Sequence, residues 1–180
     1  GLQDHFNAAY GGFKNYIFQS NSKVKVNDIK LNTKQKEDFL NKLSLYYTGI
    51  NRKADKVLGS INKSYDENKR KKLIEDSKIF RSLLKNKKYE KIGEILSQSW
   101  KFKKNFGSKR VQKILNLYYL KAKKEGMYGG KILGAGGGGY FLFISNSEKK
   151  KSIKKVLNSL EEVKFNFSKK GSEVVYNDQV

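Results

Sequence analysis

The 180-residue sequence contains no cysteine and no proline, and only one histidine and one tryptophan. The lack of cysteine excludes disulfide frameworks and thiolate metal sites, and the single histidine, His5, gives little support for metal or triad chemistry. No apolar run reaches membrane-spanning length, and the first residues lack the basic-then-apolar pattern of a secretion signal. We therefore expect a cytoplasmic protein without a membrane partner.

Acidic residues are scarce. The chain has 39 basic and 17 acidic residues, a formal net charge of +22, but only four of the basic residues are arginine. Proteins that read nucleic acids rely on arginine for bidentate contacts. Here lysines occur on nearly every predicted element, beside 16 asparagines, which is typical of an AT-rich genome. The composition argues against a nucleic-acid partner and is compatible with an anionic small-molecule substrate.

Hydrophobic residues make up 37% of the chain and aromatic residues 13%, enough for one domain or for one domain and part of another. The periodicity predicts a β-hairpin near the start, then several helices, and then a β-turn-β-helix-β segment. This order favours an α+β fold with a mainly antiparallel sheet. Helices are predicted at 1–10, 34–42, 51–64, 73–84, 89–102, 108–125 and 147–160, and strands at 13–18, 23–29, 43–47, 131–133, 140–144, 163–167 and 171–176.

Residues 126–144, GMYGGKILGAGGGGYFLFI, contain eight of the chain's 16 glycines. Linkers mix glycine with polar residues, whereas this run is flanked by two predicted strands. Its glycines permit positive φ and leave backbone N–H groups uncovered, which suits an anionic group. A glycine-rich hairpin turn packed under a helix explains the pattern equally well.

Four stretches are informative together. They are QDHFNAAYGGF at the start, LYYTGINRKADKVL at 45–58, SWKFKK at 99–104 and GKILGAGGGGYFLFI at 130–144. Together they resemble the GHMP small-molecule kinases. Within that family they are most similar to the sugar-kinase branch that includes the D-glycero-D-manno-heptose 7-phosphate kinases. The resemblance extends from residue 1 to the last predicted strand.

One motif of that family has no counterpart here. The family's ATP phosphate loop is a Pro-x-x-x-Gly-Leu-Ser-Ser-Ser type of sequence, and this chain has no proline. The resemblance therefore implies that residues 1–30 are the tail of an N-terminal kinase domain whose remainder is missing. Residues 31–180 would be the C-terminal domain, a ferredoxin-like α/β sandwich with several added helices.

The resemblance also implies an activity, ATP-dependent phosphorylation of a sugar or sugar phosphate in nucleotide-sugar or cell-surface carbohydrate biosynthesis. The acceptor that the resemblance favours is the anomeric hydroxyl of a heptose 7-phosphate. Mg²⁺ would accompany ATP, with its ligands mostly in the missing half and none assigned in this chain. Asp4 would be the catalytic base, although its place near a helix start also suits a helix-dipole role.

The remaining site residues follow from the same resemblance. Arg52 could hold the substrate's phosphate with its planar fork or be an ordinary surface arginine. Lys103 and Lys104 are expected to be solvated, because the chain has many other lysines. The expected substrate ligands are Gln3, Thr48, Arg52, Gly136 and Gly137, and the expected ATP-binding residues are Gly134 and Gly138.

Two other functions stay open at this point. The chain alone could be a sugar-phosphate-binding or regulatory module without ATP chemistry, or a basic nucleic-acid-binding domain with a steep salt dependence. Dimers are also plausible, because surfaces meant for the missing half would be exposed.

Overall fold

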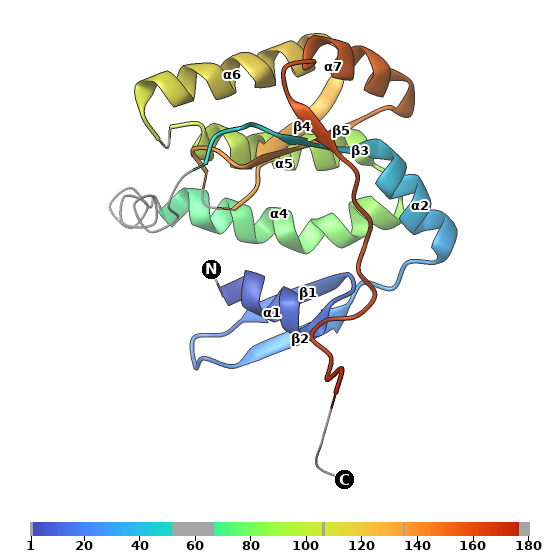
Figure 1. Ribbon diagram of the computed structural model, residues 1–180. Coiled ribbons are helices and arrows are strands. Elements are labelled where there is room, and N and C mark those ends of the chain that lie inside the picture. The colour runs from blue at the N-terminus through green and yellow to red at the C-terminus, as the bar shows by residue number, and fades with distance from the viewer. Residues whose placement is uncertain (1, 52–66, 106, 135, 177–180) are drawn as a thin grey trace. The chain divides into compact units, whose positions relative to one another are not determined.

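The computed structural model describes residues 2–51, 67–105, 107–134 and 136–176 (Figure 1). The chain divides into two compact units, one of residues 1–32 with 165–180 and one of residues 33–164. The domain division after residue 30 stays a prediction about a longer protein. Within the described residues, no helix is both long and apolar enough to cross a membrane.

The first unit is a helix with a two-stranded hairpin. Helix α1 (Leu2–Tyr10) precedes the antiparallel strands β1 (Lys14–Phe18) and β2 (Val24–Asp28). The ring of Phe6 packs 5.7 Å from Phe18 and 6.0 Å from Tyr16, which fixes the helix on the hairpin. The hairpin predicted at residues 13–29 is therefore confirmed.

The second unit is built on the antiparallel strands β3 (Leu43–Tyr47), β4 (Met127–Ile132), β5 (Tyr140–Ser145) and β6 (Glu161–Val163), in the order β4-β5-β3-β6. Counted along the described part of this unit, the strand order is 2-3-1-4 with helices between the first and second strands and between the third and fourth. That is the split βαβ arrangement of ferredoxin-like folds. The predicted α+β class with an antiparallel sheet is confirmed.

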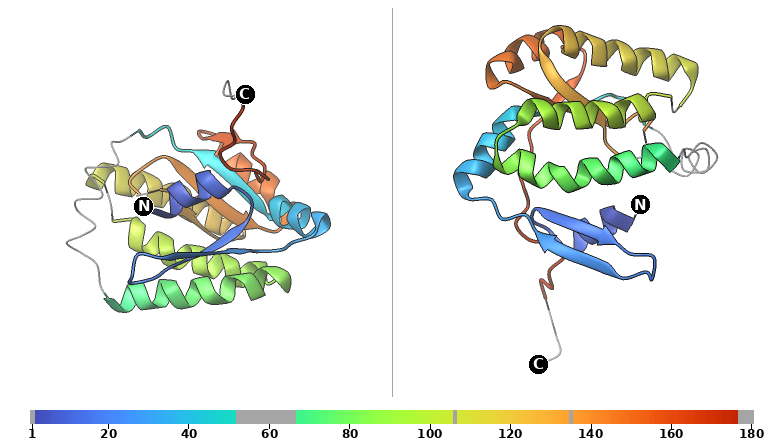
Figure 2. Two further views of the ribbon diagram at one scale, coloured as in Figure 1. Left: turned by 90° about the horizontal axis from the view of Figure 1, so that it is seen from below. Right: turned by 180° about the vertical axis from the view of Figure 1, so that it is seen from behind.

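The helices of this unit are α2 (Thr33–Lys42), α4 (Glu67–Lys85), α5 (Tyr89–Lys103), α6 (Lys109–Lys124) and α7 (Lys150–Val156), the last preceded by the 3-10 turn η1 (Ser147–Lys149). Helices α6 and α7 lie on one side of the sheet, and α5 and α4 follow one another on the other side (Figures 1 and 2). Ser108 caps α6 by accepting from the N–H of Val111, as its position before an apolar run predicted.

The core of the second unit is aromatic and aliphatic. Trp100 from α5 is 1% exposed, stacks on Tyr119 of α6 and meets Phe141 of β5 edge-on. Trp100, the chain's one tryptophan, is therefore a core residue. Aliphatic side chains of α6 and α7 complete the cluster against the strands: Leu115, Ala122, Ile153 and Leu157.

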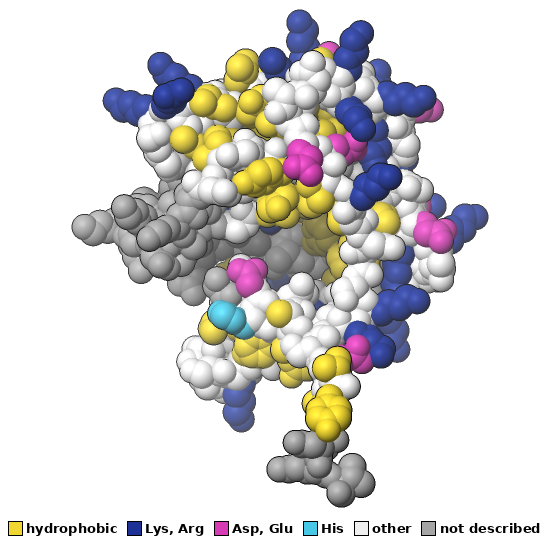
Figure 3. Space-filling view, viewed as in Figure 1, with side chains coloured by type: hydrophobic (Ala, Val, Ile, Leu, Met, Phe, Trp, Pro, Cys, Tyr) yellow, Lys and Arg dark blue, Asp and Glu magenta, His cyan; other side chains and the backbone are white. Residues whose placement is uncertain are grey.

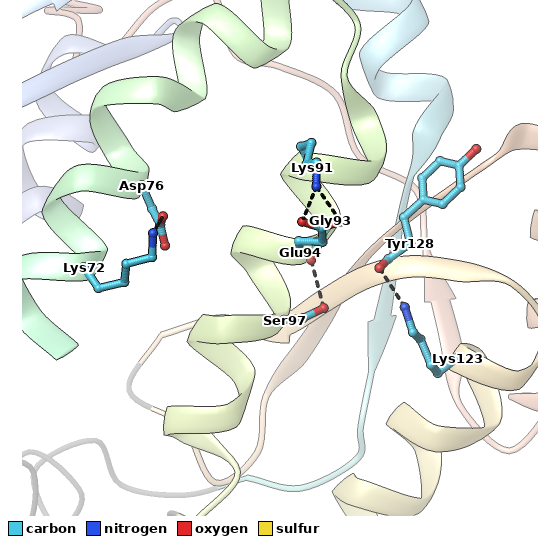
Figure 4. A network of polar contacts seen from close by, with 8 residues as sticks. All are labelled: Lys72, Asp76, Lys91, Gly93, Glu94, Ser97, Lys123 and Tyr128. Carbon is cyan, nitrogen blue, oxygen red and sulfur yellow. Dashed lines mark hydrogen bonds and ion pairs between the residues drawn. The ribbon is translucent and has the colours of Figure 1, made fainter.

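Helix α5 approaches β4 very closely. A Cβ added to Gly129 would lie 1.8 Å from the carbonyl oxygen of Gly93, so both positions need glycine. One turn later, Ser97 donates to that Gly93 oxygen, while Lys123 donates to the carbonyl of Tyr128 on the other side of β4 (Figure 4). These contacts fix where α5 runs relative to the end of β4.

Two predicted segments differ from the structure, and one lies outside it. The strand predicted at 163–167 does not continue beyond Val163, where β6 ends. The ring of Phe167 instead packs on that of Phe13 in the first unit, with 5.6 Å between the ring centroids. Residues 171–176 form no strand; in that segment the Ser172 N–H bonds the Ala9 carbonyl. Most of the helix predicted at 51–64 falls outside the described residues.

Candidate functional site

The glycine-rich turn joins β4 to β5. Its described glycines all have positive φ: 66° at Gly134, 97° at Gly136, 72° at Gly137, 144° at Gly138 and 88° at Gly139. Side chains with a Cβ rarely adopt this backbone region, so the conformation itself demands glycine. We call residues 133–139 the glycine loop.

Thr48, directly after β3, holds the exit of the glycine loop. Its backbone N–H lies 2.9 Å and its hydroxyl oxygen 2.7 Å from the carbonyl oxygen of Gly139. In return, the N–H of Gly139 donates to the carbonyl of Ile50 at 3.0 Å. Thr48 is 7% exposed, so these bonds form away from water and fix the loop to the end of β3.

The middle of the glycine loop is enclosed on two sides. A Cβ on Gly138 would lie 2.5 Å from the carbonyl oxygen of Ile50. On the other side, a Cβ on Gly107, just before α6, would lie 3.4 Å from the Cα of Gly137. The loop therefore runs between the corner after β3 and the start of α6, and Gly138 has no room for a side chain.

Three successive N–H groups stand in the middle of the glycine loop. Gly136, Gly137 and Gly138 are buried, and across the described residues their N–H groups donate to no acceptor. Buried N–H groups in folded proteins almost always have a partner. Consecutive amides on left-handed or turn backbone form a concave anion site. The arrangement suits a phosphate or carboxylate oxygen.

Lys103 holds the entrance of the glycine loop. Its ammonium donates to the carbonyl of Ile132, 3.4 Å away, and to that of Gly134. Sequence reasoning missed this residue, because one lysine among so many carries no weight. Its spacing of three residues after Trp100 was the available signal, since residues i and i+3 share a helix face.

Gln3 and Asp4 lie in the first turn of α1, in the first unit, and both are exposed. Asp4 takes part in an interaction within the protein. Their catalytic and substrate roles stay predictions. Arg52 lies outside the described residues.

Of the predicted site residues, the structure brings Thr48 together with the glycine loop. The hydroxyl of Thr48 is engaged by Gly139, a neighbour that the site prediction did not include, and its expected role as a substrate ligand stays a prediction. Gly134, Gly136, Gly137 and Gly138 all belong to the loop, where Gly134 is exposed and the other three are buried.

No metal centre is evident in the described part of the chain, which contains no group of three or more His, Cys, Asp or Glu side chains suited to a metal ion. The shifted pKa values of the described residues belong to side chains outside the glycine loop. Burial raises the pKa of Tyr46 to about 12 and also raises that of Tyr119. The loop therefore offers oriented backbone dipoles as its chemistry.

Comparison with known proteins identifies the second unit. Residues 80–163 match the family model described as GHMP kinases C terminal. The D-glycero-alpha-D-manno-heptose 7-phosphate kinase of Campylobacter jejuni subsp. jejuni serotype O:2 is 28% identical over 185 residues, covering 95% of this chain and 52% of that protein.

Solved structures share the fold. A crystal structure from Campylobacter jejuni, named as a candidate sugar kinase, aligns with a TM-score of 0.66 and 26% identity over 95% of this chain and 50% of its own. A D-glycero-D-manno-heptose 1-phosphate kinase from Bacteroides thetaiotaomicron aligns with a TM-score of 0.63 and 21% identity, over 95% and 47% of the two chains. The chain thus spans about half the length of the relatives it matches. Residues 80–163 thus match the C-terminal domain of the GHMP kinases, and the chain shares its fold with the solved structures.

Proposed function

We propose that this chain is the C-terminal part of an ATP-dependent sugar kinase whose substrate is a heptose 7-phosphate. The observation that carries the proposal is the set of three buried N–H groups at Gly136–Gly138, because they suit a phosphate oxygen. The similarity to a heptose 7-phosphate kinase over 95% of the chain supports the choice of sugar.

In the proposed reaction, the anomeric hydroxyl oxygen attacks the γ-phosphorus of ATP and the bond from that phosphorus to ADP breaks. The hydroxyl proton passes to the carboxylate of Asp4, the general base. The loop N–H groups would stabilise charge on the phosphoryl oxygens, since phosphoryl transfer depends chiefly on positioning and electrostatics.

ATP and Mg²⁺ would be held largely by a preceding kinase half, with Gly134 and Gly138 facing the nucleotide. Gln3 would contact a sugar hydroxyl, and Arg52 the phosphate of the substrate. Mg²⁺ would neutralise charge on the ATP phosphates. The protein would act in cell-surface carbohydrate synthesis in the cytoplasm.

The charge distribution gives the nucleic-acid alternative no support. On the face shown in Figure 3, the Lys and Arg side chains of the second unit are spread along its outer edges over α6, α7 and α2. They do not collect in one groove, as a nucleic-acid-binding stripe would require.

The test is ADP release by the full-length protein that contains this chain, with ATP, Mg²⁺ and a panel of heptose 7-phosphate, free heptose, mannose, galactose and fucose. We expect the highest kcat/KM with heptose 7-phosphate and a new anomeric phosphate in the ³¹P spectrum. Absence of sugar-dependent ADP release across the panel would contradict the proposal.

Calorimetric titration with heptose 7-phosphate, together with the ADP assay, tests the alternative that the chain is a binding module. If the 180-residue chain binds heptose 7-phosphate but the full-length protein releases no ADP, the chain is a sugar-phosphate-binding module. If both bind and turnover occurs, the kinase proposal holds.

A further inference from the structure

Lys103 occupies the last turn of α5 and spans the point where β4 ends and the glycine loop begins. Its ammonium donates to the carbonyl oxygens of Ile132 and Gly134, which stand on either side of Leu133. One charged group therefore binds two backbone carbonyls, one at the end of β4 and one in the glycine loop. Hydrogen bonds from an ionised donor are stronger than those between neutral groups.

The fold brings Lys103 to this point by a fixed path. Gly93 and Gly129 set the close approach of α5 to β4. From there, ten residues of helix lead to Lys103, about 15 Å, and three strand residues lead to Ile132 at the end of β4, about 10 Å. The end of the helix therefore lies within reach of the start of the loop for a side chain as long as that of Lys103, as the bonds to Ile132 and Gly134 show.

Trp100 prevents the end of α5 from shifting. It is 1% exposed and its ring centroid lies 5.3 Å from that of Tyr119 and 5.2 Å from that of Phe141. The main chain of Lys104 continues the helix by donating to the carbonyl of Trp100 at 2.8 Å. A long flexible side chain three residues after such an anchor starts from a fixed Cα.

The contact with Lys103 fixes the orientation of the peptide groups at the start of the loop. A trans peptide is planar, so its C=O and N–H point in opposite directions. The carbonyl of Ile132 accepts from Lys103, while the N–H of the same peptide, on Leu133, donates to the carbonyl of Tyr140 at 2.8 Å. Lys103 and Tyr140 thus hold the two sides of one peptide, and Lys103 also holds the carbonyl two residues further on, at Gly134.

We propose that Lys103 is a positioning residue that fixes the entrance of the glycine loop, as Thr48 fixes its exit. With both ends held, the N–H groups of Gly136–Gly138 keep one direction and meet a phosphate without reorganisation. The last step rests on the proposed kinase function; the control of loop geometry does not.

The first test is amide hydrogen exchange in the 180-residue chain, measured residue by residue by NMR. Lys103→Met keeps the side-chain length but removes the donor, and Lys104→Met is the matched control for loss of one exposed charge. We expect exchange at Leu133 to become about tenfold faster in Lys103→Met, with less than about a twofold change in Lys104→Met and at Phe143 in the core. Lys103→Arg, which keeps a charged donor, should restore slow exchange in large part.

Three results would overturn the proposal. They are unchanged exchange at Leu133, an equal acceleration at Phe143, and a Lys103→Met chain that does not fold. The last two would show that Lys103 supports the core as a whole.

The second test uses the full-length enzyme. Lys103→Met should lower kcat/KM for ATP about 10- to 100-fold, because misplacing a positioning group by about 1 Å has effects of that size. Lys104→Met should stay within about twofold of wild type. If the wild-type protein shows no sugar-dependent turnover, the proposed function fails, and the exchange measurement still decides the role of Lys103. Faster exchange with unchanged kcat/KM would refute the link from the loop to phosphate.

Discussion

The hydroxyl of Thr48 lies 2.7 Å from the carbonyl oxygen of Gly139, across 91 positions of sequence. The N–H of Thr48 donates to the same oxygen at 2.9 Å. One carbonyl therefore receives two donors from a single residue, and the exit of the glycine loop is tied to the end of β3. This pairing connects β3 of the antiparallel sheet to the glycine loop.

Replacing Thr48 with Val should loosen that exit. Valine has nearly the same shape but lacks the donor, so we expect a loss of about 1 kcal/mol in the free energy of unfolding. The carbonyl oxygen of Gly139 still accepts from the backbone N–H of residue 48, which limits the loss. Urea titration of the 180-residue chain measures it.

Thr48→Ser is the matched control, since it keeps the hydroxyl and loses a methyl group. We expect the amide of Gly139 to exchange about tenfold faster in the Val variant than in the Ser variant. Equal exchange rates in the two variants would show that the hydroxyl does not hold the loop.

Alanine should be tolerated unequally along the glycine loop. At Gly138 a Cβ would meet the Ile50 carbonyl oxygen at 2.5 Å on a backbone with φ of 144°. At Gly134 it would meet nothing within 4 Å, and φ is 66°. Gly134→Ala should therefore cost about 1–2 kcal/mol, the left-handed penalty alone, and Gly138→Ala at least about 2 kcal/mol more.

Urea unfolding of the two variants decides this comparison. Gly134→Asn is a useful third variant, because asparagine enters the left-handed region more readily than alanine. It should be the most stable of the three. A Gly138→Ala chain as stable as Gly134→Ala would mean that the loop does not press against the corner after β3.

Much of this fold follows from local signals. Ser108 and Gly126 marked the ends of α6, and the glycine run marked the turn between β4 and β5, because caps and left-handed turns depend on neighbouring residues. The alternation at Phe165 and Phe167 misled, since a strand also needs a partner, and the ring of Phe167 instead packs against Phe13.

The contacts that shape the candidate site were less accessible from sequence. Thr48 and Gly139, Gly93 and Gly129, and Lys103 and Gly134 are each pairs distant in the chain. Their meeting depends on strand order and helix placement, which no local pattern specifies. The resemblance to a kinase family supplied the glycine residues of the site and Thr48, but neither the bond from Thr48 to Gly139 nor the contact of Lys103 with the loop.

The Asp38–Tyr89 pair should make stability depend on pH at both extremes. The Tyr89 hydroxyl donates to Asp38 at 2.8 Å, and Lys87 lies 3.0 Å from the same oxygen. The hydrogen bond from Tyr89, and then that from Lys87, hold the pKa of Asp38 below its usual value. Burial, and then Asp38, raise the pKa of Tyr89.

Because the folded pKa of Asp38 is lowered, its contribution is complete above its unfolded pKa of about 4 and is lost as the pH falls through the folded value. For Tyr89 the folded pKa is raised, so its contribution is complete below about pH 10 and is lost as the pH rises through the folded value. Tyr89→Phe should lower stability at pH 7 by about 1 kcal/mol.

Urea titrations from pH 3 to pH 11 test this prediction, with Asp38→Asn as the second variant. Both variants should show a shallower loss of stability in acid than the wild type. A wild-type and a Tyr89→Phe profile that differ by a constant at every pH would show that the pair contributes packing without linkage.

The central claim is that Asp4 accepts the hydroxyl proton in a sugar kinase that includes this chain. The most direct measurement compares kcat for heptose 7-phosphate between the full-length wild type and Asp4→Asn, with thermal unfolding to show that both are folded. We expect kcat to fall by about 100- to 10,000-fold, the usual contribution of a general base, with the unfolding temperature unchanged. A folded Asp4→Asn enzyme with near wild-type kcat would contradict the account.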